Sequence, residues 1–210
     1  MYNKKTAYAL LSAILVISLV HVQPGLGLNT ADKKQSFEIT EVSFTIIGTS
    51  NVRDWEIESD EMTGTVVFGP AFFGGGDDPD QWFEEISLRI ANESLDSGIS
   101  AMNSAMHDNL ETDEHPELRY RLGRVDRVTG SVDSGNLTFR VYGVATAAGN
   151  DHRFMHDVDV TLQDDGTYHV SGSMDLRFTQ FNIEPPTFMR GALTTDNEMQ
   201  VEYSFTLVEQ

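Results

Sequence analysis

Alternation of apolar and polar residues runs through most of this chain and restricts its fold more than any other feature. Leu118, Tyr120 and Leu122 alternate with charged residues, and the same period of two recurs between Phe37 and Leu207. Side chains at alternate positions of a β-strand point to opposite faces of the sheet. The pattern therefore predicts half-buried strands that share one apolar face.

About eight to ten such strands are predicted, mostly joined by turns. The first, residues 37–47, changes parity at Glu41, which indicates a β-bulge. Asp165 and Gly166 tolerate the positive φ angles of a tight hairpin turn. An antiparallel meander must protect its edge strands, and closure removes those edges. We predict an all-β fold, an antiparallel eight-stranded barrel just wide enough for side chains or one slender ligand.

One segment changes the period from two to that of a helix. Its apolar residues, spaced by three and four, are Ile99, Met102, Met106 and Leu110. Asp96 or Ser97 can accept a hydrogen bond from the first turn, and Pro116 prevents continuation. We predict one short helix over about 97–110, near the barrel opening, which either packs on the barrel or closes one end.

The N-terminal segment has the pattern of a secretory signal peptide. Lys4 and Lys5 precede an apolar run over residues 7–20, and small residues follow at 25–27. The alternative is an uncleaved anchor, but the run is shorter than the ~18 residues that a spanning helix requires. We expect a signal peptide over 1–27, a linker over 28–35 and one domain over 36–210, which is periplasmic or secreted.

Composition excludes several classes of function. The chain has no cysteine, so disulfides, thiolate metal sites and cysteine nucleophiles are impossible. It carries 33 acidic and 14 basic residues, a net charge of −19, which argues against binding nucleic acid or anionic membranes. The dense carboxylates serve either simple solubility or adaptation to salt.

The candidate chemical motifs are weak. His152 and His156 border a predicted strand, where four residues span about 13 Å, so one metal ion cannot reach both. No G-x-S-x-G, H-E-x-x-H or phosphate-loop motif occurs. We therefore expect neither an enzyme nor a cofactor.

A glycine-rich loop that begins at Pro70 is the least regular part of the predicted domain. Its three aspartates are Asp77, Asp78 and Asp80. Calcium prefers oxygen ligands, but the ordered ligand spacing of a calcium loop is missing, so a solvated loop is expected and calcium binding stays open. Phe72 and Phe73 either fold back over the domain or rim an opening.

Three stretches, in this order and spacing, resemble the YceI-like family of exported lipid- or polyisoprenoid-binding proteins. They are Gly48-Thr49-Ser50-Asn51-Val52-Arg53-Asp54-Trp55; Ser94-Leu95-Asp96-Ser97-Gly98 with His115-Pro116-Glu117-Leu118-Arg119-Tyr120; and Phe181-Asn182-Ile183-Glu184-Pro185-Pro186 with Gly191 and Glu198-Met199-Gln200-Val201. Arg53 stands where the family suggests histidine, and Glu184 and Thr194 stand where lysines are common. The missing lysines weaken the case for an anionic head group.

The resemblance implies a lipocalin-like barrel whose cavity holds an isoprenoid or other long-chain amphipath, such as a prenyl quinone. It implies no catalytic residues. Whether the protein forms a homodimer stays open. The alternative is a lipid-free envelope or adhesion module with a filled barrel. Candidate ligand-binding residues are Trp55, Met102, Met106, Phe139, Phe178, Phe181, Phe188 and Met189. Each of them is equally compatible with ordinary packed core.

Overall fold

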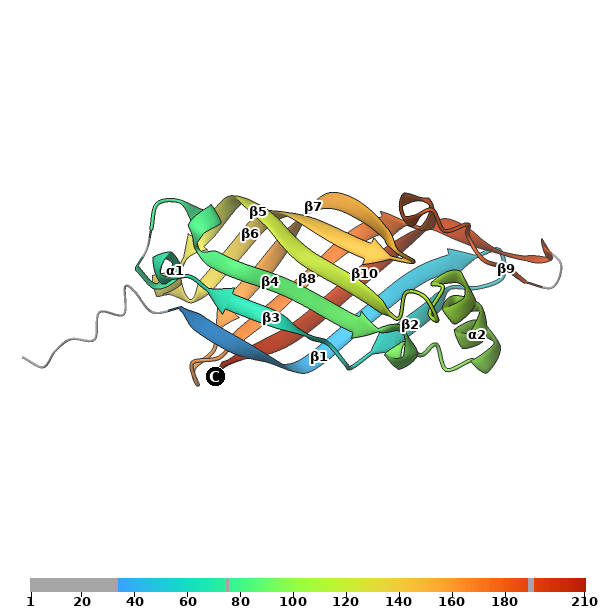
Figure 1. Cartoon of the computed structure of the whole chain (residues 1–210), viewed down its shortest axis with the longest axis horizontal. Helices are drawn as coiled ribbons and strands as arrows, with labels where there is room; N and C mark the ends of the chain where they lie inside the picture. Colours follow the sequence, from blue (N-terminus) through green and yellow to red (C-terminus); the bar gives the residue numbers. More distant parts are fainter. Residues whose placement is uncertain (1–33, 75, 189–190) are drawn as a thin grey trace, which may run out of the picture.

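The computed structural model describes residues 34–74, 76–188 and 191–210, most of which lie in one antiparallel sheet. The strands are β1 (Gln35–Ser50), β2 (Trp55–Ser59), β3 (Thr63–Phe68), β4 (Phe83–Ala91), β5 (Glu117–Ser131), β6 (Asn136–Ala147), β7 (Asn150–Leu162), β8 (Tyr168–Arg177), β9 (Thr187–Phe188) and β10 (Leu193–Glu209). Helices α1 (Pro70–Gly74) and α2 (Ser100–Asn109) lie at opposite ends of the long axis (Figure 1). The short 3₁₀ turns are η2 (Pro79–Gln81), η3 (Asn92–Ser94), η4 (Val132–Ser134) and η5 (Phe178–Phe181).

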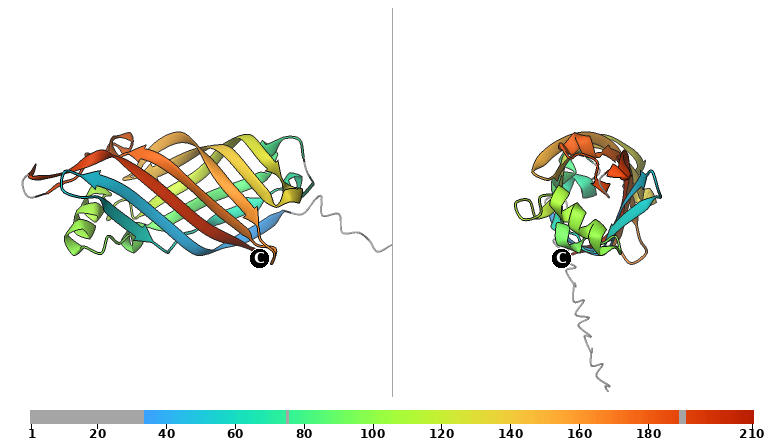
Figure 2. Two further views of the ribbon diagram at one scale, coloured as in Figure 1. Left: turned by 180° about the vertical axis from the view of Figure 1, so that it is seen from behind. Right: turned by 90° about the vertical axis from the view of Figure 1, so that its right-hand side faces the viewer.

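The sheet closes on itself to form a barrel. Its strand order is β2-β1-β3-β4-β5-β6-β7-β8-β10-β9, and the additional pairing of β1 with β10 joins the two edges. Strands β2 and β3 pair with opposite ends of β1 and act as one interrupted strand, while β9 is a two-residue extension beside β10. The barrel therefore has eight strands, which confirms the predicted eight-stranded antiparallel barrel (Figure 2).

The predicted bulge in the first strand is present. The register of β1 against β10 shifts between Thr40 and Ser43, and Glu41 has a φ of 51°. The hydroxyl of Thr206 on β10 donates a hydrogen bond of 2.9 Å to the Glu41 carboxylate. A bulge increases local twist, which helps a long strand to curve around the barrel.

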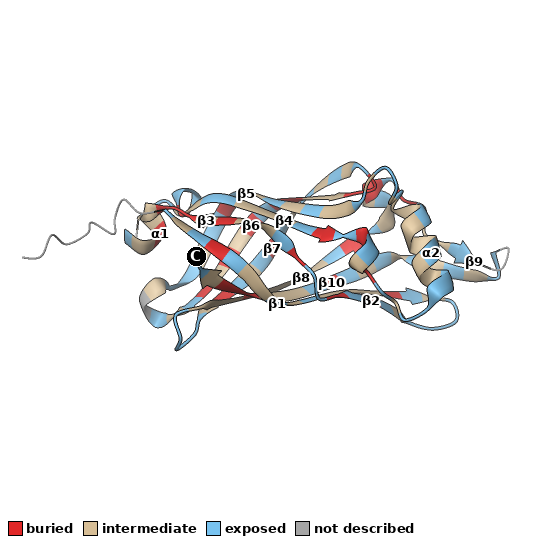
Figure 3. Ribbon diagram, turned by 60° about the horizontal axis from the view of Figure 1, so that its bottom comes forward, coloured by how far each residue is buried: buried red, intermediate tan, exposed pale blue. Residues whose placement is uncertain are grey.

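Burial alternates along the strands, so that buried and exposed positions follow each other (Figure 3). On β6 the buried residues Leu137, Phe139 and Val141 alternate with more exposed ones. On the outer face, Arg140 donates two hydrogen bonds of 2.7 Å to Asp157, and this guanidinium lowers the pKa of the Asp157 carboxyl. Because both side chains are partly exposed, the pair contributes little to stability.

Aromatic side chains fill the barrel end beside α1. We call this cluster the aromatic plug; its members are Phe37, Phe68, Phe72, Phe73, Trp82, Phe83 and Tyr168. Phe72 is 1% exposed, and its ring centroid lies 4.6 Å from that of Phe68. Burying a phenylalanine to this extent contributes about 1.5–3 kcal/mol.

The loop from Pro70 is more ordered than the sequence suggests. It forms α1 and η2 where the composition predicts an irregular loop, because Phe72 folds back into the core and anchors the segment. Trp82 adds a hydrogen bond from its indole nitrogen to the carbonyl of Gly76, 2.8 Å. The carboxylate of Asp80 accepts a hydrogen bond from the backbone amide of Val125, which ties the loop to β5.

Helix α2 lies at the other end of the barrel, the end that also carries β2 and β9 (Figures 1 and 2). It is shorter than the predicted 97–110, and its N-cap residue is Ile99, which makes no side-chain capping bond. The prediction that Asp96 or Ser97 caps the helix is wrong. The Asp96 carboxylate instead accepts bonds from the Gly98 amide and the Asn103 side chain, so it holds the turn before the helix.

The predicted signal peptide, residues 1–27, and most of the predicted linker lie outside the described residues. Strand β1 begins at Gln35, one position before the expected domain start. Among the described residues, no helix has the length and apolar character needed to cross a membrane.

Candidate functional site

An apolar cavity of about 250 Å³ lies inside the barrel. Phe68 and Phe83 of the aromatic plug border one end, and Met102 and Met106 of α2 border the other. Valines, leucines and isoleucines from the inward faces of the strands form much of the wall between them. The volume is near the lower limit of roughly 300 Å³ seen for ligand pockets, which suits a narrow ligand better than a bulky one.

Six of the eight candidate binding residues border this one cavity: Trp55, Met102, Met106, Phe139, Phe178 and Phe181. Phe139 and Phe181 are buried, whereas the other four are partly buried. The backbone of Phe188 lies in β9, but its side chain and the whole of Met189 are outside the described part. Contact of any of these residues with a ligand stays a prediction.

Trp55 is held in place by two contacts at the α2 end of the barrel. Its ring packs directly over Gly48 of the neighbouring strand β1, where a larger residue would collide with it. The indole nitrogen donates a hydrogen bond of 3.1 Å to the carbonyl of Thr49. The ring centroid of Phe178 lies 6.1 Å away, so two aromatic rings stand together on the cavity wall.

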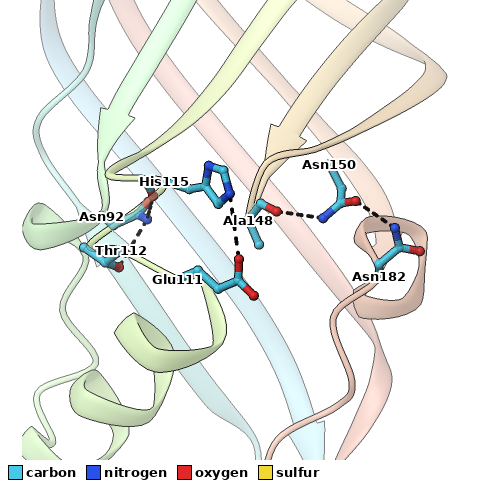
Figure 4. Close-up of polar contacts among 7 residues, drawn as sticks. All are labelled: Asn92, Glu111, Thr112, His115, Ala148, Asn150 and Asn182. Carbon is cyan, nitrogen blue, oxygen red and sulfur yellow. Dashed lines mark hydrogen bonds and ion pairs between the residues drawn. The ribbon is translucent and has the colours of Figure 1, made fainter.

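Polar contacts fasten the segment after α2 to the barrel (Figure 4). Buried Asn92 donates from its amide nitrogen to the carbonyl of His115, 2.8 Å, and to the hydroxyl of Thr112, 3.3 Å. The imidazole of His115 lies 3.7 Å from Glu111 and packs against Gly149 in the β6–β7 hairpin. The end of α2 is thus joined to two separate parts of the barrel rim.

A second set of contacts continues around the same rim (Figure 4). Asn150 donates to the carbonyl of Ala148, 2.6 Å, and its own side-chain oxygen accepts from Asn182, 2.7 Å. Asn182 follows η5 and has the left-handed φ of 56° that asparagine tolerates. These contacts join the β6–β7 hairpin to the segment that carries Phe178 and Phe181.

Three polar side chains interrupt the apolar wall near its middle: Tyr120 on β5, His156 on β7 and Tyr203 on β10. The His156 ring centroid lies 5.6 Å from that of Tyr120 and 6.5 Å from that of Tyr203. Burial lowers the pKa of His156 to about 4 and raises the pKa of both tyrosines. At neutral pH all three groups are therefore uncharged.

Sequence reasoning considered His156 only as a metal ligand and did not single out either tyrosine for the cavity. His156 has the same parity as the inward residues Val158 and Val160, and this signal could have placed it inside the barrel. Which strands face one another across a barrel depends on the register, so the meeting of β5, β7 and β10 around one point required the structure.

Among the described residues, one group has metal-ligand geometry: Glu111, Glu114 and His115, with ligand atoms within 4.8 Å of one another. It lies outside the cavity, and exposed acidic groups of this kind are common without an ion. In the loop after α1, the Asp78 carboxylate accepts bonds from the Asp80 amide and from Gln81. These contacts give Asp78 a structural role in η2.

No family model matches the sequence, and no curated protein matches it. Solved structures do match. BcnA of Burkholderia cenocepacia aligns with a TM-score of 0.60 and 16% identity over 79% of this chain and 95% of BcnA. A polyisoprenoid-binding domain of Saccharophagus degradans, implicated in plant cell wall breakdown, aligns with a TM-score of 0.62 and 13% identity over 84% of this chain and 98% of that domain.

A YceI protein of Campylobacter jejuni also aligns, with a TM-score of 0.52 and 12% identity over 73% of this chain and 84% of the other. Structural matches at identities this low establish the fold alone. The ligand has to be argued from the residues of this chain. The protein has the closed antiparallel eight-stranded barrel fold of these YceI and polyisoprenoid-binding proteins.

Proposed function

We propose that this protein is a carrier that holds an isoprenoid or other long-chain lipid inside its barrel. The observation that supports this function most is the elongated apolar cavity between the aromatic plug and α2. Burial of a hydrocarbon chain contributes about 0.8 kcal/mol per CH₂, so a long chain gains affinity with few polar contacts. The two methionines of α2 suit a variable chain because their side chains are flexible and polarizable.

The barrel shared with a polyisoprenoid-binding domain supports the same ligand class. The alternative is a lipid-free interaction module with a filled barrel. It fits less well because a cavity remains inside the barrel. The apolar run over residues 7–20 supports export to the periplasm or the outside of the cell. A ligand of low water solubility gives a reason for a carrier in such an aqueous compartment.

Binding of a short-chain prenyl quinone, followed by quenching of tryptophan fluorescence, tests this function. Trp55 borders the cavity and reports on its occupation. The variant Ala145→Phe places a ring in the cavity wall and should weaken binding at least tenfold by occupying the space of the chain. Tyr142→Phe on the same strand is the matched control, because Tyr142 is exposed on the outer face.

Saturable quenching in the parent protein and in Tyr142→Phe, with loss in Ala145→Phe, is the expected result. Equal affinity in all three proteins would place the quinone outside the barrel. Absence of binding to the parent protein, for the quinone and for long-chain alcohols alike, would remove the carrier function.

A further inference from the structure

The polar side chains in the middle of the cavity are not explained by apolar packing. His156 is 7% exposed, and its Nδ1 atom has no hydrogen-bond partner among the described residues. A buried polar atom without a partner carries a desolvation cost that native proteins usually avoid. The imidazole borders the cavity, and its Nδ1 atom is itself covered by protein atoms.

The two tyrosines around His156 are partly buried, and in the described part of the chain their hydroxyls also lack a protein partner. Burial is the largest cause of the raised pKa of each phenol, and within the described residues neither hydroxyl hydrogen-bonds to a protein group. Each ring is set against a glycine of the neighbouring strand, Tyr120 against Gly143 and Tyr203 against Gly172. These glycines give the rings space to lie flat on the wall.

The wall is apolar on both sides of this polar group. Toward the aromatic plug, Val158 and Val160 follow His156 at inward positions of β7, over about 13 Å of strand. Toward α2, Phe154 precedes it, with a ring centroid 5.0 Å from the imidazole. The three side chains therefore form a compact polar group between two apolar parts of the cavity wall.

The charge of this part of the cavity is close to zero. His156 is neutral at pH 7 because burial lowers its pKa to about 4, and both phenols keep their protons. Arg89 and Arg119 border the cavity, but both are exposed and alternate with the inward-facing Leu88 and Leu118. An anionic group beside His156 would be desolvated without a compensating cation, at a large cost.

We propose that Tyr120, His156 and Tyr203 form a binding subsite for an uncharged oxygen group of the lipid, a hydroxyl or a carbonyl, and that this subsite discriminates against phosphorylated isoprenoids. The inference rests on the proposed carrier function and adds the class of head group. A carbonyl can accept from either phenol, and a hydroxyl can accept from a phenol or donate to a neutral imidazole. Either bond satisfies a protein group that is unpartnered without the lipid.

Four probes with the same C15 chain test the subsite: farnesol, farnesal, farnesyl diphosphate and the hydrocarbon farnesene. Each is titrated by tryptophan quenching into the parent protein and into Tyr203→Phe, Tyr120→Phe and His156→Leu. We expect farnesol or farnesal to bind about two- to tenfold tighter than farnesene, the ratio that a hydrogen bond supplies. Farnesyl diphosphate should bind at least tenfold more weakly than farnesol.

Removal of a polar group should reduce the affinity for the oxygen-bearing probe about two- to tenfold and leave farnesene unchanged. Comparison of farnesol with farnesal tells which oxygen group is preferred. Melting of the lipid-free proteins separates recognition from folding. Because the phenols have no partner, Tyr203→Phe and Tyr120→Phe should keep the parent melting temperature, and they remain informative if His156→Leu folds poorly.

The outcomes separate this inference from the carrier function. Equal binding of farnesol, farnesal and farnesene, unchanged in the variants, would overturn the subsite and leave the carrier function standing. Tighter binding of farnesyl diphosphate than of farnesol would also overturn it. Failure of every probe, farnesene included, would overturn both.

Discussion

Protonation of His156 should weaken the fold at mildly acidic pH. Burial lowers the pKa of this imidazole to about 4 in the folded protein, against 6.5 for an ordinary histidine. Between pH 6.5 and about 4, His156 therefore binds a proton in the unfolded chain and stays neutral in the folded chain. The stability that depends on neutral His156 is complete above pH 6.5 and is lost as the pH falls from 6.5 toward 4.

The gap between these two values corresponds to about 3 kcal/mol in total, of which about 2 kcal/mol is lost between pH 7 and pH 5. A loss of 2 kcal/mol lowers the melting temperature of a domain of this size by about 4–8 °C. The carboxyls with lowered pKa, such as those of Asp151 and Asp157, stay ionised in this window. Their protonation lowers the folding stability only at lower pH.

Urea unfolding of the lipid-free protein at pH 7, 6 and 5 measures this loss. The variant His156→Leu cannot titrate at this position, so its free energy of unfolding should fall by about 2 kcal/mol less than that of the parent over this range. His169→Gln changes a residue on the outer side of β8. Its free energy of unfolding should change with pH as that of the parent does. Identical pH profiles for the parent and His156→Leu would refute the reasoning that His156 is buried and neutral.

Three further predictions test the plug, the helix and the surface charge. Phe72→Ala should cost about 3–5 kcal/mol in urea unfolding, whereas Val52→Ala, at a site 67% exposed, should cost almost nothing; a loss under about 1 kcal/mol at Phe72 would contradict the plug. Met102→Gln combined with Met106→Gln should weaken prenyl quinone binding with a loss of stability well below the 1–3 kcal/mol that each fully buried amide costs. Full binding with a large loss of stability would make α2 a scaffold, and the double leucine variant is the control. With 33 acidic residues, the protein should melt at a higher temperature in molar sodium chloride, and a flat or falling melting temperature would exclude adaptation to salt.

The period of two was enough to predict a closed antiparallel barrel. Alternation on β6 and β7 separates inward from outward residues without knowledge of the partner strands, and the bulge at Glu41 was visible as a change of parity. The segment from Pro70 could not be predicted in the same way. Its order comes from Phe72 packing on Phe68 and Trp82, contacts that no local pattern contains.

The cavity wall was partly predictable for a similar reason. Inward aromatics such as Phe139 and Phe181 follow from parity, but parity does not distinguish a cavity wall from packed core. The helix boundary at Ile99 was missed because Asp96 bonds to the preceding turn in place of the first helical amides. The meeting of Tyr120, His156 and Tyr203 depends on barrel register, which pairs residues far apart in the chain.

Mass spectrometry of an organic extract tests the central claim most directly. The protein is purified without added lipid, and the extract is compared with that of Ala145→Phe, prepared in the same way. The carrier function predicts an isoprenoid or other long-chain lipid, near one molecule per chain in the parent and strongly reduced in the variant. The subsite further predicts that this lipid carries an uncharged oxygen group. An extract without lipid, from a protein that also fails to bind an added prenyl quinone, would contradict it.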